Sequence, residues 1–162
     1  MSSIFTKIVN DEIPSFKVHE DKSHLAFLDI NPLKKGHTLV IPKKEVDYIF
    51  DIHSKEYEEL WRFAKTVAKA IKKVIRCERV SIVVVGLEVP HAHIHLVPLN
   101  SVEDINFSRP KLELEENEFL EAIEETIYVI ESYDITTVRA SVGNYLVGKY
   151  IKDNTDCKVI YN

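Results

Sequence analysis

The hydrophobic positions of the N-terminal part change from a helical spacing to short strand-like runs. Residues 4–9 place apolar side chains at helical spacing, and the polar and proline residues at 11–14 predict a turn after them. Residues 17–20, 24–30 and 37–42 are short apolar or mixed runs bounded by polar, proline or glycine residues. This part is therefore expected to form a short helix followed by three strands.

The longest helical pattern begins at Ser54, which suits an N-cap, and acidic residues follow in the first turn. Its apolar positions form one stripe, which predicts a long helix packed on a core. Two further strands are predicted at residues 80–85 and 91–99, on either side of a loop that contains Gly86 and Pro90. The residues of the stripe are Leu60, Phe63, Ala64, Val67, Ile71, Val74 and Ile75.

The chain changes character after residue 100. Residues 112–125 contain seven glutamates, which favours a solvated helix face over an acidic binding tail. Residues 135–151 are predicted to form another helix, with Asp134 as a cap, and residues 158–161 a last strand.

Composition narrows the classes of protein to consider. With 162 residues, of which 45% are hydrophobic and 29% charged, the chain is expected to be a soluble globular protein. The net charge of −5 argues against nucleic acid as a partner. Two cysteines at unrelated positions favour a reducing compartment. Neither a signal peptide nor a run of about 20 apolar residues is present, so no membrane association is predicted and the cytoplasm is expected.

Three of the seven histidines, His91, His93 and His95, occupy alternate positions. On a strand they would share one face, while the apolar residues between them would face the core. Three explanations compete. The face could be incidentally polar, it could bind zinc with His37 or Glu88 as a further ligand, or it could attack a phosphoryl group with one imidazole as the nucleophile.

This stretch resembles the His-φ-His-φ-His-φ-φ signature of the histidine triad (HIT) family of nucleotide hydrolases and transferases, in which φ is apolar. Residues 4–14, 25–32 and 36–43 are similar to further segments of that family, in the same order, so that the resemblance covers roughly residues 3–125. It implies an α+β fold, with a long helix packed on an antiparallel sheet, to which the helix predicted at residues 135–151 adds a helical extension at the C-terminus.

The resemblance also implies roles for four histidines. His93 would be the nucleophile that takes the nucleotidyl phosphate, and His95 and His91 would support it, His91 in part structurally. His37 would assist the leaving group or the triad. The implied substrate is a purine nucleotide, either a phosphoramidate or a dinucleoside polyphosphate, with no cofactor and no bound metal.

The nucleotide site implied by the resemblance includes Asp29 at the ribose hydroxyls, Ile30 and Phe27 near the base, and Glu88 and Val89 beside the phosphate. Many relatives have Gly-Gln-Ser-Val where this chain has residues 86–89, and their Gln and Ser side chains contact phosphate. Leu87 cannot donate a hydrogen bond, and an ionised Glu88 would repel phosphate. An alternative is therefore a nucleotide-binding module with weak or lost catalysis; a metal-binding protein is a weaker one.

One other position departs from the family pattern, and the last part of the chain lies outside it. Glu45 stands where relatives often have a histidine after Pro-Lys-Lys, and homodimers are common in the family, so a homodimer is expected. Residues 126–162 resemble a fragment of asparagine synthetase but lack the ATP loop of that family, so the predicted organisation is a HIT domain at 1–125 and a non-catalytic extension at 126–162.

Overall fold

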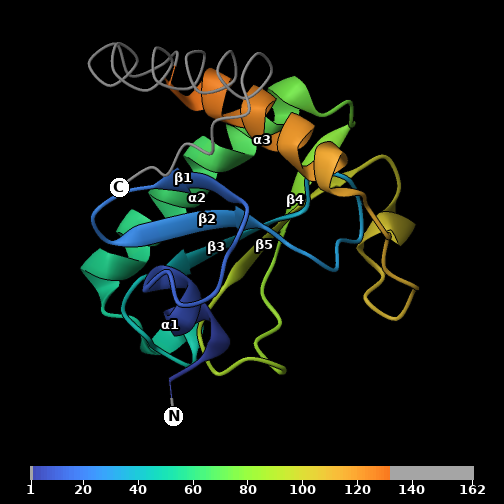
Figure 1. Ribbon diagram of the computed structural model, residues 1–162. Helices are drawn as coiled ribbons and strands as arrows, with labels where there is room; N and C mark the ends of the chain where they lie inside the picture. Colours follow the sequence, from blue (N-terminus) through green and yellow to red (C-terminus); the bar gives the residue numbers. More distant parts are fainter. Residues whose placement is uncertain (1, 132–162) are drawn as a thin grey trace. The chain divides into compact units, whose positions relative to one another are not determined.

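Five short strands pair into one antiparallel sheet with the order β1-β2-β3-β5-β4 (Figure 1). The computed structural model describes residues 2–131, and up to Ile130 they form one compact unit. Helices accompany the sheet, which confirms the predicted α+β class. The strands are β1 (Lys17–Glu20), β2 (His24–Leu28), β3 (Thr38–Pro42), β4 (Arg79–Val83) and β5 (Ile94–Leu99). The α-helices are α1 (Ile4–Val9), α2 (Ser54–Val74) and α3 (Glu116–Glu131), and two short 3-10 helices span Ile49–Asp51 and Val102–Ile105.

The two faces of the sheet bury different sets of side chains. Alternate residues of β2, β3 and β5, such as Ala26, Val40 and Ile94, join the large core that includes the apolar stripe of α2. The residues between them, such as Phe27 and Leu39, join a smaller cluster with Phe5 of α1. Because side chains alternate along a strand, α2 and α1 serve opposite faces of the sheet.

Helix α2 follows the predicted stripe closely. It buries Leu60, Phe63, Ala64, Val67, Ala70 and Ile71, and each fully buried large aliphatic side chain contributes about 1.5–3 kcal/mol. Its start differs by one residue from the prediction, because His53 is the N-cap and Ser54 the first helical residue. At the other end, Ile75 is the C-cap.

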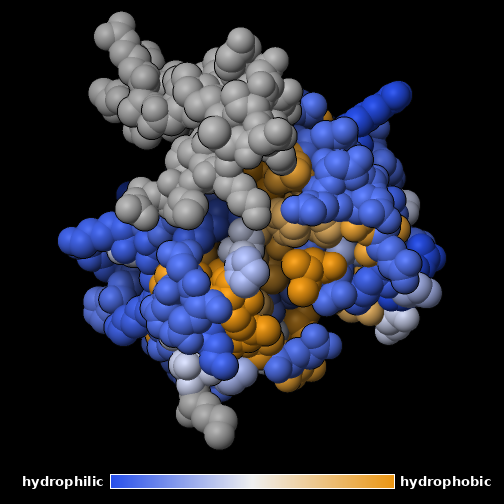
Figure 2. Space-filling view, viewed as in Figure 1, coloured by the Kyte–Doolittle hydropathy of each residue, from blue (hydrophilic) through white to orange (hydrophobic). Residues whose placement is uncertain are grey.

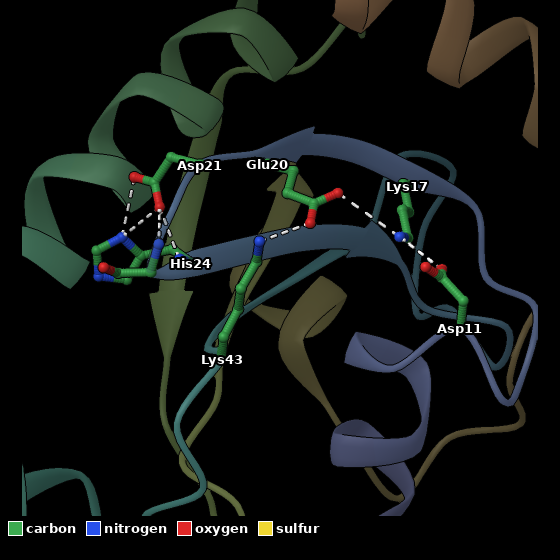
Figure 3. Close-up of polar contacts among 7 residues, drawn as sticks. Asp11, Lys17, Glu20, Asp21, His24 and Lys43 are labelled. Carbon is green, nitrogen blue, oxygen red and sulfur yellow. Dashed lines mark hydrogen bonds and ion pairs between the residues drawn. The ribbon is translucent and has the colours of Figure 1, made fainter. Parts of the chain in front are cut away.

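Ion pairs fix the hairpin of β1 and β2 (Figure 3). Asp21 Oδ1 accepts the backbone N–H groups of Ser23 and His24, each at 2.7 Å, which shapes the turn between the strands. Lys43 Nζ lies 2.6 Å from Glu20 Oε1 and ties the end of β3 to the same hairpin. Lys17 Nζ reaches back to Asp11, at 2.7 Å, just after α1.

Helix α3 packs on the same core as α2. Phe119, Ala122 and Ile130 are buried there, and the ring of Phe119 stacks on Phe16 with centroids 4.7 Å apart. The helix starts at Glu116 and continues past residue 125, so the predicted boundary at 125/126 falls inside a continuous helix. That boundary stays a prediction, and the elements predicted at 135–151 and 158–161 lie outside the described residues.

Several strand ends also differ from the predictions. β2 stops at Leu28, β3 starts at Thr38 and β4 spans Arg79–Val83 instead of residues 80–85. Strand ends depend on which backbone groups find a partner across the sheet, which local sequence does not specify. Within the described part of the chain, no helix is long and apolar enough to span a membrane.

Candidate active site

The three alternating histidines do not all lie on a strand. Strand β5 starts at Ile94, so His95 alone belongs to it, while His91 and His93 precede it; the predicted strand over 91–99 is therefore too long. The pairing of β5 with β3 begins at Ile94, the first residue of β5, which lies opposite Val40. The three side chains are nevertheless buried together, with 0, 6 and 8% exposure.

The rings still gather on the α1 side of the sheet. The His93 and His95 rings are 4.8 Å apart, and the Phe5 ring of α1 contacts both His91, at 5.9 Å, and His93, at 5.1 Å. The apolar residues between the histidines enter the opposite core with α2. Alternation of side chains therefore holds through the triad, although regular strand pairing begins only at Ile94.

The backbone of His91 fixes the protonation of the His93 ring. His93 Nδ1 lies 2.7 Å from the carbonyl oxygen of His91. A carbonyl oxygen can only accept, so Nδ1 carries the hydrogen and donates it. In the neutral ring the lone pair is then on Nε2, which is the atom available as a nucleophile.

Two further hydrogen bonds fix the positions of the ring hydrogens of His37 and His95. The backbone N–H of Leu33 donates to His37 Nδ1 at 3.1 Å, so the hydrogen of His37 is on Nε2. Nε2 lies 3.1 Å from His95 Nδ1, which must accept, and His95 in turn carries its hydrogen on Nε2.

Burial keeps this pair neutral. His37 is 1% exposed, and burial, with help from the charge of Lys111, lowers its pKa to about 4. Burial also lowers the pKa of His95 to about 3, with His93 and His37 as further causes. Both imidazoles are therefore uncharged near neutral pH, as the hydrogen-bond directions require.

Asp29 lies beside His37 and is more exposed than either histidine. Its Oδ2 is 3.5 Å from His37 Nδ1, Oδ1 accepts the backbone N–H of Asn31 at 2.9 Å, and its side chain is 18% exposed. Asp29, His37 and His95 offer ligand atoms within 4.8 Å of one another, which is a spacing that a metal ion could use. However, His37 Nδ1 already accepts from Leu33 and His95 Nδ1 accepts from His37 Nε2, so neither of these lone pairs is free and the three residues fit a metal centre poorly.

The remaining predicted nucleotide residues differ in exposure. Ile30 is 67% exposed, whereas Phe27 is buried with its ring 5.6 Å from that of Phe5. Val89 is half-buried against the same apolar cluster. Leu87 is 87% exposed and Glu88 is exposed as well, so this pair lies at the surface just before the buried triad.

Sequence reasoning missed two residues beside the triad. The Phe107 ring is 5.0 Å from the His95 ring, and Lys111 Nζ is 5.1 Å from the Phe107 ring and donates to its carbonyl at 3.0 Å. Leu112, the next residue, donates its N–H to the Pro32 carbonyl at 2.9 Å, which holds this irregular segment near His37. No periodicity marks such a segment, so only its position in the fold reveals it.

Comparison with known proteins gives two separate results. One stretch of 45 residues is 58% identical to human asparagine synthetase; it covers 28% of this chain and 8% of that protein. It is longer than residues 126–162, which were predicted to resemble that family. The resemblance to a fragment of asparagine synthetase is thus confirmed.

The larger result concerns the rest of the chain. The HIT domain profile matches residues 10–102. An uncharacterized HIT-like protein of Borreliella burgdorferi is 40% identical over 126 residues, which cover 73% of this chain and 91% of the relative. Adenosine 5'-monophosphoramidase of Saccharomyces cerevisiae is 41% identical over 100 residues, 59% of this chain and 61% of the relative. A crystal structure of a hypothetical histidine triad nucleotide-binding protein from Sulfolobus tokodaii superposes with a TM-score of 0.70 at 26% identity, covering 79% of this chain and 91% of that one. The chain therefore belongs to the histidine triad (HIT) family.

Proposed function

We propose that this protein is a hydrolase that cleaves purine nucleoside phosphoramidates or dinucleoside polyphosphates through a covalent nucleotidyl-His93 intermediate. The hydrogen bond from His93 Nδ1 to the carbonyl of His91 carries the proposal, because it leaves the lone pair of Nε2 free for attack on phosphorus. Burial of the triad also supports it, since electrostatic interactions are stronger where water is excluded.

The first step forms a bond between His93 Nε2 and the α-phosphorus. The P–N or P–O bond to the leaving group breaks, and its electron pair stays with the leaving group, which takes the proton of His95 Nε2. In the second step water attacks phosphorus, the electron pair of the P–N bond returns to His93, and a proton of the water passes to His95. The product is a nucleoside monophosphate and the histidines are regenerated.

The proton that the leaving group needs can arrive through His37. The negative phosphate of the substrate stabilises a protonated imidazole beside it, so a proton can bind with the substrate. Protonation of His37 Nδ1 replaces the hydrogen bond that this atom accepts from the Leu33 N–H, and Asp29 Oδ2, 3.5 Å away, accepts the new hydrogen and stabilises the charge. The Nε2 hydrogen of His37 then moves to His95 Nδ1, 3.1 Å away, while His95 gives up its Nε2 hydrogen.

We assign the nucleoside to the residues around Asp29. A carboxylate accepts hydrogen bonds from both hydroxyls of a ribose. Ile30 is exposed enough to contact a base, whereas Phe27 is buried and Val89 packs against the same apolar cluster as Phe27. Figure 2 shows apolar surface gathered in the middle of the molecule near α1, with hydrophilic atoms around it, which suits a base. We place the exposed Glu88 beside the phosphate.

The names of two relatives support the substrate class. Proteins of Saccharomyces cerevisiae and Schizosaccharomyces pombe, 41% and 36% identical to this chain over about 60% of its length, are adenosine 5'-monophosphoramidases. An adenosine phosphoramidate is therefore the first substrate to test.

The test is a panel of adenosine and guanosine phosphoramidates and dinucleoside polyphosphates, assayed with the wild type and His93→Ala. The variant should lose turnover and keep most of its AMP affinity, because it lacks the nucleophile but keeps Asp29. The control is His53→Ala, which changes an exposed histidine and should behave like the wild type. Turnover retained by a correctly folded His93→Ala protein would exclude the covalent mechanism.

A second candidate function is nucleotide binding with little turnover. The exposed pair Leu87 and Glu88 favours it, because neither side chain can donate a hydrogen bond to phosphate at neutral pH. Phosphorus NMR of the enzyme after an alkaline quench separates the two functions. A base-stable, acid-labile histidine adduct supports catalysis; AMP binding without any adduct supports the binding module.

We further propose that the protein is a homodimer that works in the cytoplasm. Strand β4 is an edge of the sheet and carries exposed Ile82, followed by exposed Val84 and Val85; an apolar edge of this kind can pair with a second copy. Cys77 is a free, buried thiol, which suits a reducing compartment. Light scattering of the wild type and Ile82→Lys tests the dimer: the variant should be monomeric, and an unchanged mass would rule out this edge.

A further inference from the structure

We propose that Ser3, Thr6 and Glu45 form a hydrogen-bonded support that holds His91, and through its carbonyl the nucleophile His93, in the reactive position. These three are positioning residues, since Ser3 and Thr6 contact His91, Glu45 contacts Ser3 and Thr6, and none of them contacts a reacting atom. The inference rests on the proposed function, but the hydrogen bonds themselves are a property of the folded protein and can be tested separately.

The support brings together residues that are far apart in the sequence. Ser3 Oγ lies 2.8 Å from His91 Nδ1, across 88 positions of the chain. The backbone N–H of Ser3 donates to Glu45 Oε2 at 2.9 Å, and the hydroxyl of Thr6 donates to the same oxygen. Ser3 and His91 are buried, with 6% and 0% exposure, so their polar atoms depend on these partners.

The direction of each hydrogen bond follows from its partner. His91 Nε2 lies 2.8 Å from the carbonyl oxygen of Pro42, which can only accept, so Nε2 carries the hydrogen. Nδ1 of His91 is then the acceptor, and Ser3 must donate to it. Burial lowers the pKa of His91, so the neutral ring that this pattern needs is the stable one.

Ser3 is held so that it can donate. It is the N-cap of α1, and its Oγ accepts the backbone N–H of Thr6 at 3.1 Å. The hydrogen bonds from Thr6 and Ser3 lower the pKa of the Glu45 carboxyl, which is therefore ionised at neutral pH and accepts from both. Glu45, which replaces the histidine common at this position in relatives, thus anchors the start of α1.

The consequence for His93 passes through one backbone group. The ring of His91 is fixed on both sides, by Ser3 and by Pro42, and its carbonyl oxygen accepts the Nδ1 hydrogen of His93. The Phe5 ring of α1 also contacts the His91 and His93 rings. If α1 loosens, both the hydrogen bond that orients the nucleophile and the ring packed against it are disturbed.

The test compares Ser3→Ala with Lys7→Gly, in the wild-type background of the full chain. Both changes weaken α1, the first by removing its cap and the second by placing glycine at an exposed helical position, but only Ser3→Ala removes the donor to His91. We expect kcat for the adenosine phosphoramidate to fall roughly tenfold to a hundredfold in Ser3→Ala, with KM within about twofold, because misplacement of a reacting group acts on the chemical step.

Two more variants sharpen the comparison. Ser3→Thr restores a hydroxyl and should recover most of kcat. Glu45→Ala should lower kcat in the same direction as Ser3→Ala, and the double variant should lose less than the product of the two single losses, since both act through one support. A loss in Lys7→Gly equal to that in Ser3→Ala, or a Ser3→Ala enzyme with wild-type kcat, would overturn the proposal.

NMR of the histidine side chains gives a readout that does not need turnover. Long-range ¹H–¹⁵N spectra report which ring nitrogen carries hydrogen and how fast it exchanges. The Nδ1 hydrogen of His93 should exchange slowly in the wild type and Lys7→Gly and faster in Ser3→Ala. If the wild type turns over no substrate, the proposed function fails, but the exchange rate of the His93 Nδ1 hydrogen still tests whether Ser3, Thr6 and Glu45 hold His91. Equal exchange in all three proteins would refute that role.

Discussion

Lowering the pH from 7 to 5 should destabilise the folded protein through its buried histidines. His37 and His95 are 1% and 8% exposed, and burial lowers their pKa values to about 4 and about 3. In the unfolded chain an imidazole has a pKa of about 6.5. Between these values the unfolded state binds protons that the folded state does not, so the free energy of unfolding must fall as the pH falls.

The magnitude follows from the two pKa values. A histidine that stays neutral in the folded state loses about 1.4 kcal/mol of stability per pH unit below about 6.5. From pH 6.5 to 5 this is about 2 kcal/mol for each residue, or about 4 kcal/mol for the pair. His91, whose pKa is also lowered by burial, acts in the same direction. Such a loss is a large part of the roughly 5–15 kcal/mol by which domains are stable.

Urea unfolding at pH 7, 6 and 5 measures this loss as a change in the midpoint at constant m. This pH window lies above most carboxyl pKa values, so histidines dominate it. His37→Gln should lose about 2 kcal/mol less than the wild type between pH 7 and 5. His53→Gln, at an exposed position, should match the wild type. If the wild type loses less than about 1 kcal/mol, the histidines are not held neutral and the hydrogen-bond directions assigned to His37 and His95 are wrong.

Three further predictions concern the rest of the fold. Gly36 and Gly86 both have positive φ, 83° and 70°, but a Cβ would lie 2.8 Å from Ile75 Cγ1 only at Gly36. Gly86→Ala should therefore lower the free energy of unfolding by about 1–2 kcal/mol, and Gly36→Ala should lower it by about 1–3 kcal/mol more, in thermal or urea unfolding. Equal losses in the two variants would show that the contact with Ile75 has no effect. Lys111→Gln removes a positive charge that lowers the pKa of His37, so this pKa should rise in an NMR titration. The same loss of charge should weaken AMP binding about two- to fivefold in calorimetry at low salt, and the difference from the wild type should vanish at high salt. Ile130→Ala should lower the free energy of unfolding by about 2–4 kcal/mol if the part of α3 beyond residue 125 belongs to the HIT core, whereas an unchanged midpoint would restore the boundary at 125/126.

The alternation of polar and apolar residues was enough to predict the elements with strong local periodicity. Helix α1 and strand β1 have the predicted bounds, and the stripe of α2 is buried as its spacing required. In these elements, residues at a regular spacing lie on the same face, every turn in a helix and every second position in a strand. The three alternating histidines, also a local feature, led to the family.

The ends of elements and the protonation of the site depended on partners elsewhere in the chain. Strand β5 starts at Ile94, after His91 and His93, because its pairing with β3 starts there, opposite Val40. The hydrogen position on the His93 ring follows from one carbonyl, and the hydrogen positions of His37 and His95 follow from the N–H of Leu33. None of these bonds has a signature in residue spacing.

The residues that sequence reasoning could not assign are those whose role comes from long-range contact. Glu45 was a departure from the family pattern with no role, until the fold brought its carboxylate to the backbone of Ser3, 42 positions away. Phe107 lies in an irregular segment and reaches His95 only in the folded chain. The sequence alone indicated the family and pointed to the three histidines, because their alternation is a local feature. Only the tertiary structure decided which atoms of those rings are free to react, because a hydrogen bond is set by the group that the fold places opposite each nitrogen.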